Sequence, residues 1–100
     1  MLKSLNEMTP EILSGVEEMA GCFFEPKKIA LALEIDIELM TRQMNLEDSD
    51  IYRAFHKGWL NAEFQHRKSI ISLAKSGSSP AQTMVTSMLD KAKLKLLDNG

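Results

Sequence analysis

The sequence predicts an all-α fold in which an N-terminal unit of three helices is followed by a long helical hairpin. Apolar residues recur three or four positions apart over most of the chain, which is the spacing of a helical face. Gly and Pro are few, and most of them lie between these periodic segments, where they separate helices. Only six of the 100 residues are aromatic and seven are Met, a composition unlike that of a β-sandwich or barrel.

The first predicted helix covers residues 10–20. Thr9 can cap its N-terminus, and Pro10 fits the first helical position because its missing N–H is not needed there. Glu11 lies near the positive end of the helix dipole, which favours an acid. Gly21 can end the helix.

The residues that follow this helix are apolar. Cys22 is the single cysteine of the chain, so an internal disulfide and a zinc site built from the cysteines of one chain are excluded. Its apolar neighbours predict a buried thiol that serves only in packing. We expect Phe23 and Phe24 to be core anchors beneath the three-helix unit.

Residues 26–45 predict two short helices joined by a tight turn. The apolar pattern breaks at residues 34–36, where Asp36 can cap the second helix. Two short helices that cross around such a turn form a helix-turn-helix unit, whose second helix enters the major groove of DNA. Residues 1–46 are therefore predicted to form a helix-turn-helix DNA-binding head.

The second helix of this unit, at about residues 37–45, is the predicted recognition helix. Leu39 and Met40 should face the core. The outer face offers Arg and Asn, which are residue types that read guanine and adenine in the major groove. Two lysines at the start of the preceding helix can contact phosphate. The predicted DNA-binding residues are Lys27, Lys28, Ile37, Glu38, Thr41, Arg42 and Asn45.

Residues 47–100 are predicted to form an oligomerising hairpin of one long and one shorter helix. The long helix runs from about residue 50 to residue 76, and Gly77 can supply the left-handed conformation that ends it. Ser79 and Gln82 have the spacing of a capping box at the start of the last helix. The short turn between the two helices indicates an antiparallel arrangement.

The apolar residues of the long helix cover a wider arc than one shorter helix can bury, so a further partner is expected. Gly58 in the middle of this helix costs roughly 1 kcal/mol relative to Ala, which favours a close approach of another helix there. The predicted oligomer interface consists of Ile51, Phe55, Trp59, Phe64, Met84 and Met88.

Charge is distributed unevenly along the chain. Residues 1–50 contain four Lys/Arg and eleven Asp/Glu residues, a balance of −7, whereas residues 51–100 contain eight and three, a balance of +5. This asymmetry favours head-to-tail contacts within or between chains. Because phosphate neutralisation supplies most non-specific affinity for DNA, the acidic first half predicts weak binding by the head alone.

The cations of the second half form two groups. Lys91, Lys93 and Lys95 crowd the last turns of the final helix, where they suit the negative end of its dipole. The cations of the long helix can form either a solvated face that matches the acidic half or a surface that contacts phosphate. These cations are Arg53, Lys57, Arg67, Lys68 and Lys75.

The sequence contains no pattern that is typical of an enzyme. His56 and His66 lie about fifteen ångströms apart along one helix, so they cannot share a metal ion. No nucleophile elbow, HExxH motif or Gly-rich phosphate loop occurs. We therefore expect no catalytic residue, no cofactor and no metal site.

The sequence also gives no indication of a membrane location. No stretch approaches the roughly twenty consecutive apolar residues of a transmembrane helix. The N-terminus, MLKSLNEM, lacks the apolar block of a signal peptide. A cytoplasmic protein that does not bind membranes is expected.

Two segments carry a resemblance to a known family: KKIALALEIDIELM and IYRAFHKGWLNAEFQHRKSIISLAKSGSSPAQTMVTSML. Tyr52, Gly58, Ala74, Gly77 and Ala81 match a Tyr-to-Gly segment, an Ala-x-x-Gly turn and an Ala-rich final helix. In this order of parts the chain resembles the small subunits of phage terminases, which join a helix-turn-helix to a long helical hairpin. It departs from the usual helix-turn-helix pattern in the turn, where Glu34 takes the place of Gly.

The resemblance implies recognition of viral DNA at the start of packaging by a homo-oligomer of phage or prophage origin. It also implies a partner, the terminase large subunit, that holds the ATPase and the nuclease. Two alternatives remain open. One is a helix-turn-helix transcriptional regulator with the hairpin as its dimerisation element. The other is a helical protein-interaction module that does not bind DNA.

Overall fold

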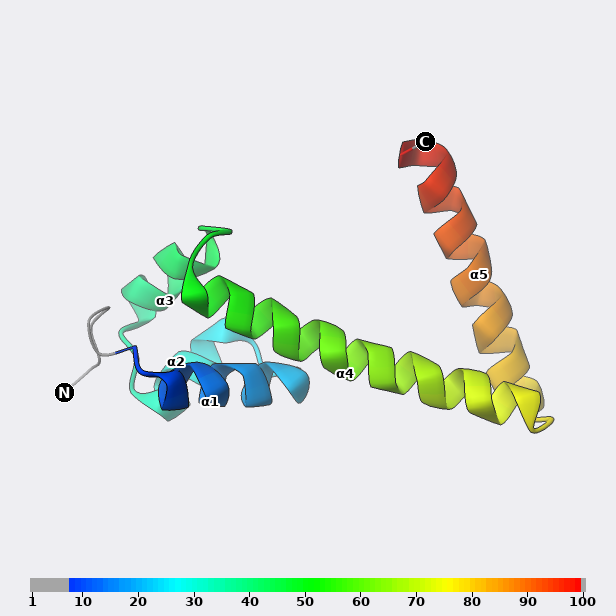
Figure 1. Ribbon diagram of the computed structural model, residues 1–100, viewed down its shortest axis with the longest axis horizontal. Helices are drawn as coiled ribbons and strands as arrows, with labels where there is room; N and C mark the ends of the chain where they lie inside the picture. The colour runs from blue at the N-terminus through cyan, green and yellow to red at the C-terminus, as the bar shows by residue number, and fades with distance from the viewer. Residues whose placement is uncertain (1–7, 100) are drawn as a thin grey trace. The chain divides into compact units, whose positions relative to one another are not determined.

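The computed structural model describes residues 8–99, and every regular element in that range is an α-helix (Figure 1). The prediction of an all-α fold is confirmed. The chain divides into two compact units, of which the first ends at Glu63 and the second begins at Phe64, within the longest helix. The helices are α1 (Pro10–Gly21), α2 (Pro26–Leu33), α3 (Ile37–Met44), α4 (Asp50–Lys75) and α5 (Ser79–Asn99).

Helix α1 begins after Thr9 and ends at Gly21, as the sequence predicts. The Thr9 Oγ1 atom accepts a hydrogen bond from the Ile12 N–H at 3.3 Å, which confirms Thr9 as the cap. At the other end Phe23, and not Gly21, adopts the left-handed conformation, with φ of 67°. The Phe24 N–H then donates to the Met19 carbonyl at 3.2 Å, which is the hydrogen bond of a Schellman motif.

The residues after α1 are exposed, contrary to the expectation of a buried apolar run. Phe23 is 50% exposed and Phe24 is 42% exposed. Cys22 is also exposed. The left-handed turn at Phe23 directs the chain from α1 toward α2, so these three residues lie at a corner of the unit and not beneath it.

Helices α2 and α3 are each eight residues long and are joined by a short turn. Glu34 adopts the left-handed conformation in this turn, with φ of 58°, and its N–H donates to the Ala30 carbonyl. The Ile35 N–H donates to the same carbonyl at 2.8 Å. Asp36 is the N-cap residue of α3, but its side chain accepts no capping hydrogen bond, unlike the sequence-based expectation.

The core of the first unit is formed by one face of each of helices α1, α2 and α3 together with the first turns of α4. Because α4 supplies two of the buried side chains, this unit extends beyond residue 46, where the sequence predicts a domain boundary. The buried apolar residues are Val16, Ala20, Ile29, Ala30, Ile35, Leu39, Met40, Ile51 and Phe55.

Two contacts fix the start of α4 and its position against α1. The Ser49 Oγ accepts a hydrogen bond from the Tyr52 N–H at 3.0 Å and donates to the Gln43 carbonyl at 2.7 Å, so Ser49 caps α4 and ties it to the end of α3. Further along, Gly58 is buried against the backbone of Glu17, which confirms the close helix approach predicted at this glycine.

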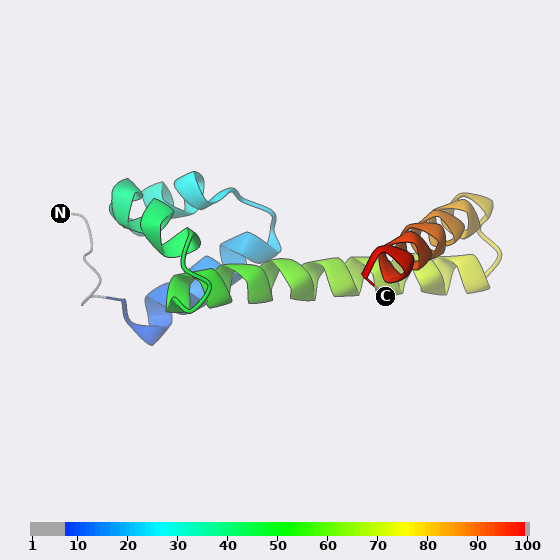
Figure 2. The ribbon, with the colours of Figure 1, turned by 90° about the horizontal axis from the view of Figure 1, so that it is seen from above.

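The second unit contains the last turns of α4, a short loop and α5 (Figure 2). Gly77 has φ of 101° and ends α4, as predicted. At the start of α5 the Ser78 Oγ, and not Ser79, accepts the capping hydrogen bond from the Ala81 N–H at 3.4 Å. The Gln82 Nε2 donates to the Ala74 carbonyl of α4 at 3.1 Å, so it does not complete the predicted capping box.

Packing within the second unit is restricted to the region near this loop. Among its described residues only Ile70 and Ala81 are buried. Toward the end of α5, Leu94, Leu96 and Leu97 are 62%, 72% and 78% exposed. The described residues therefore leave a large apolar surface of α5 exposed.

Candidate nucleic-acid interface

The predicted recognition helix has one buried face and one exposed face. Leu39 and Met40 are 7% and 1% exposed and belong to the core, as expected. The exposed residues lie three and four positions apart, so they share the opposite face of α3. These exposed residues are Glu38, Thr41, Arg42 and Asn45, the last of which is the C-cap residue of the helix.

Ile37 differs from the other predicted DNA-binding residues. Its side chain is half-buried and packs against the core of the first unit. The sequence predicts it near the outer face because it is the first residue of α3, where the apolar period is poorly defined. Its principal role in the fold is therefore packing.

Thr41 makes a hydrogen bond within its own helix. Its hydroxyl group donates to the Ile37 carbonyl at 2.9 Å. The hydroxyl hydrogen is thereby engaged, while the Thr41 Oγ1 keeps lone pairs that can accept. This is the bond to the carbonyl four residues earlier that Ser and Thr side chains make within helices.

Lys27 and Lys28 are exposed in the first turn of α2. Glu25 precedes this helix as its N-cap residue, but its side chain makes no capping hydrogen bond. Because Lys27 and Lys28 are in the first turn, two cations lie near the positive end of the α2 dipole, and this turn contains no acid. This is an unfavourable arrangement for the isolated helix, and an anion bound nearby would relieve it.

A shallow hollow joins the start of α2 to the end of α3. It brings together three of the predicted residues, Lys27, Thr41 and Asn45, although they come from two different helices. Lys28, Glu38 and Arg42 do not line it. The remaining lining residues, which the sequence does not single out, are Glu25, Pro26 and Met44.

The exposed predicted DNA-binding residues of α2 and α3 together form the α2–α3 surface. The electrostatic character of this surface is mixed. Its cations are Lys27, Lys28 and Arg42, and Glu38 is its exposed acid. Of these four residues only Lys27 lines the hollow, which it shares with the carboxylate of Glu25. The surrounding unit, residues 1–63, contains six Lys/Arg and twelve Asp/Glu residues, a balance of −6. This surface can therefore neutralise only a few phosphate groups.

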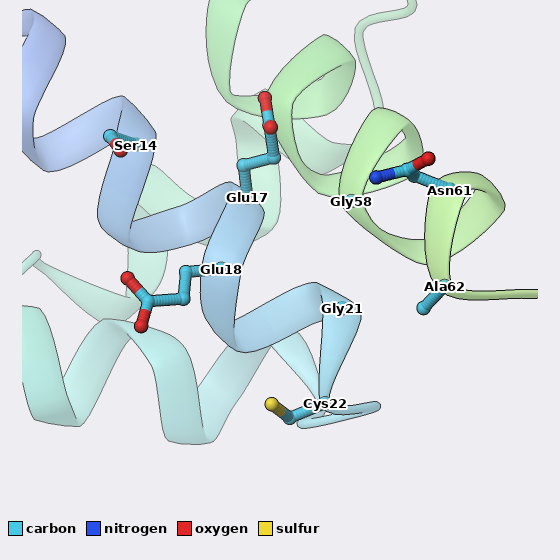
Figure 3. Close-up of a pocket in the computed structure, with 8 residues that line it drawn as sticks. All are labelled: Ser14, Glu17, Glu18, Gly21, Cys22, Gly58, Asn61 and Ala62. Carbon is cyan, nitrogen blue, oxygen red and sulfur yellow. The ribbon is translucent and has the colours of Figure 1, made fainter. Parts of the chain in front are cut away.

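A second hollow of the first unit lies between the end of α1 and the middle of α4 (Figure 3). Figure 3 shows that the side chains of Glu18 and Cys22 point away from Asn61 on the facing helix, so the polar groups do not converge. In the described part of the chain, no three His, Cys, Asp or Glu side chains are grouped so that they could hold a metal ion. This hollow carries no recognisable chemistry.

The structure separates the predicted oligomer interface into two parts. Ile51 and Phe55 are 1% and 8% exposed because they complete the core of the first unit, so little of either side chain is accessible to a partner. Trp59, Phe64 and Met84 are exposed. Met88 is half-buried. The last four remain available to a partner in whole or in part.

No protein-family model, curated protein or solved structure matches this chain. Within the described residues, no helix combines the length and the apolar character needed to cross a membrane.

Proposed function

We propose that this protein is a non-enzymatic DNA-binding protein that works as an oligomer, in the manner of a phage terminase small subunit. In this proposal residues 26–45 are a helix-turn-helix, and the exposed face of α3 contacts the major groove. The observation that carries it is the arrangement of polar side chains on that face: Arg42 and Asn45 lie three residues apart on one exposed surface, and Asn45 lines a hollow together with Lys27 of α2.

The backbone of the turn supports this proposal. Glu34 takes the left-handed conformation that Gly commonly supplies between the two helices of such a unit. Glu34 therefore differs from the usual Gly in residue type but has the same backbone conformation.

Binding by one subunit is expected to be weak because the head is acidic. Several heads displayed on one oligomer would raise the effective concentration of each head at the DNA, so useful affinity does not require a strong single contact. The exposed apolar residues of α4 and α5 supply surface for such an assembly. The proposal further includes a cytoplasmic location and a terminase large subunit as partner.

The proposed DNA contact is tested by fluorescence anisotropy with labelled duplex DNA at several salt concentrations. Replacement of Lys27, Lys28 and Arg42 by Ala should weaken binding and lower its dependence on salt by about one unit of slope for each phosphate group that the variant no longer neutralises. Arg53→Ala is the matched control for one charge, because Arg53 is exposed on another helix of the same unit. Unchanged binding in the triple variant would remove the α2–α3 surface from the proposal.

A second candidate function is a helical protein-interaction module that does not bind DNA. The specific observation in its favour is the uncovered apolar surface of α5, which includes Leu94, Leu96 and Leu97. Such a module would show no binding to duplex DNA even at low salt. A transcriptional regulator, in contrast, would bind DNA as a dimer, and light scattering separates a dimer from a larger oligomer.

A further inference from the structure

The second unit contains a hollow whose charged lining is entirely cationic. It has a volume of about 390 Å³, within the range of roughly 300–1,000 Å³ that is common for ligand sites. Arg67 of α4 lines it from one side. The other lining residues come from α5 and are Met88, Lys91, Ala92 and Lys95.

The four α5 residues lie on one face of that helix. Lys91 and Lys95 are four residues apart, as are Met88 and Ala92, and this spacing makes the members of each pair neighbours on a helix surface. Two lysines in this relation repel each other, which destabilises the helix modestly when no anion lies between them.

The acids of this unit do not line the hollow. Residues 64–100 contain six Lys/Arg residues and two acids, Asp90 and Asp98, a balance of +4. Asp90 is adjacent to Lys91 in sequence and Asp98 follows Lys95 by three residues, but neither contributes to the lining. The hollow consequently presents cationic groups at its wall together with the apolar surface of Met88 and Ala92.

This combination suits an anion that carries several oxygen acceptors. The ammonium groups of Lys91 and Lys95 can donate charge-assisted hydrogen bonds to phosphate oxygens without a fixed geometry, and the guanidinium group of Arg67 adds positive charge. All three cations are exposed, so the attraction is screened by salt and should weaken as the salt concentration rises. A phosphate group is the common biological anion with this geometry and charge.

We propose that the hollow formed by Arg67, Lys91 and Lys95 binds the phosphodiester backbone of DNA. The identity of the polymer rests on the proposed function, but the residues of the hollow are separate from the α2–α3 surface. In this proposal the second unit, with a balance of +4, supplies the positive charge that the acidic first unit lacks.

The test compares two double variants that remove equal charge from the second unit of the full-length protein. Lys91→Ala/Lys95→Ala removes two lining residues, whereas Lys75→Ala/Lys93→Ala removes two exposed lysines that do not line the hollow. Circular dichroism establishes that both variants keep their helices. Binding of a labelled duplex is then measured by anisotropy over a range of salt concentrations.

The lining variant should bind the duplex roughly tenfold more weakly at low salt, and its salt slope should fall by about two. The control variant should bind less than about threefold more weakly than the wild type, which is the effect of net charge alone. Equal weakening in the two variants, or unchanged binding in the lining variant, overturns the proposal. A single Arg67→Ala variant provides a second measurement and should also bind more weakly.

Two further arms identify the source of the phosphate and separate this site from the head. Tripolyphosphate should compete with the duplex for binding to the wild-type protein. If the wild-type protein bound tripolyphosphate but not the duplex, the assignment of the hollow to DNA would be overturned. The triple variant, in which Lys27, Lys28 and Arg42 are replaced by Ala, should keep the part of the DNA affinity that the hollow supplies. If the triple variant binds DNA as the wild type does while the lining variant binds more weakly, the proposed helix-turn-helix contact is contradicted and the proposed phosphate site in the hollow is supported.

Discussion

Gly58 of α4 lies against the backbone of Glu17 of α1, so that a Cβ atom built on Gly58 would be 3.0 Å from the Glu17 Cα and closer still to its carbonyl oxygen. Only a residue without a side chain permits this approach of two helices. Lys57 and Glu17 also face each other here, with 3.8 Å between Nζ and Oε1, but their side chains are 76% and 40% exposed, so the ion pair contributes little. The absence of a side chain at Gly58 is the main determinant of this helix crossing.

We expect Gly58→Ala to destabilise the first unit by about 1–3 kcal/mol, because the added methyl group would overlap backbone that cannot move easily. The sign is informative, since the helix propensity of Ala alone would stabilise α4 by about 1 kcal/mol. Urea denaturation followed by circular dichroism measures the change.

Gly21→Ala is the matched control for this substitution. A Cβ on Gly21 would lie 3.4 Å from the Gly58 carbonyl oxygen, which is ordinary contact, so stability should change by less than about 1 kcal/mol. If the two variants unfolded at the same urea concentration, the close approach at Gly58 would not be a determinant of stability.

Glu34→Gly should stabilise the first unit by up to about 1 kcal/mol. The left-handed conformation of Glu34, with φ of 58°, costs about 1–2 kcal/mol for a residue with a Cβ, and the greater freedom of Gly in the unfolded chain offsets part of the gain. Glu18→Gly is the control, because Glu18 is an exposed residue inside α1 and the same change there should cost about 1 kcal/mol. Thermal unfolding of both variants should show shifts of opposite sign.

The exposed residue Phe23 offsets the cost of its left-handed backbone through a ring contact. Its ring meets the Trp59 ring edge-on, with 4.7 Å between the ring centroids. Such a pair contributes about 0.5–1.5 kcal/mol beyond the area it buries. Phe23→Ala should therefore destabilise the unit by about 1–2 kcal/mol, and Phe23→Gly should destabilise it less because Gly relieves the strained φ.

Trp59 is the single tryptophan of the chain, so its fluorescence reports this contact directly. Both Phe23 variants should shift the emission of Trp59 to longer wavelength, because they expose the indole ring to water. Phe24→Ala is the control at the neighbouring aromatic residue. An emission spectrum that changed with Phe24→Ala and not with Phe23→Ala would contradict the assigned contact.

The local signals in the sequence were sufficient to predict most helix boundaries. Thr9, Gly58 and Gly77 act through their immediate backbone or their lack of a side chain, so their roles follow from the sequence alone. The errors concern residues whose position depends on distant packing. An apolar run gives no sign that Phe23 lies at a corner, and an apolar residue such as Ile51 can fill either a core or an interface.

The candidate sites show the same limit. The spacing of Thr41 and Asn45 places them on one face of α3, but their meeting with Lys27 requires the crossing of α2 and α3, which spacing does not define. The sequence identifies Arg67 and the lysines of α5 as cations, and the spacing of Lys91 and Lys95 places them on one helical face. Nothing in the sequence indicates that they would line one hollow.

Glu38→Gln should strengthen binding to duplex DNA about two- to fivefold at low salt, because it removes a carboxylate from the exposed face of α3, which the proposal places in the major groove of the negatively charged DNA. The gain should disappear at high salt, where screening weakens the repulsion. Glu18→Gln removes the same charge from an exposed position on α1 and should leave affinity nearly unchanged. A similar gain in both variants would show that net charge, and not contact by α3, controls binding.

The exposed apolar residues of the long helix and of α5 should determine the mass of the protein in solution. Phe64 and Met84 are 56% and 48% exposed, and both belong to the predicted oligomer interface. Light scattering of the wild type should give the mass of an oligomer, and Phe64→Asp/Met84→Asp should lower it, because a buried unpaired carboxylate is costly at an interface. Leu31→Asp is the control, since Leu31 is 64% exposed on α2, outside that interface. A wild-type protein that is monomeric at all concentrations would contradict the oligomeric part of the proposed function.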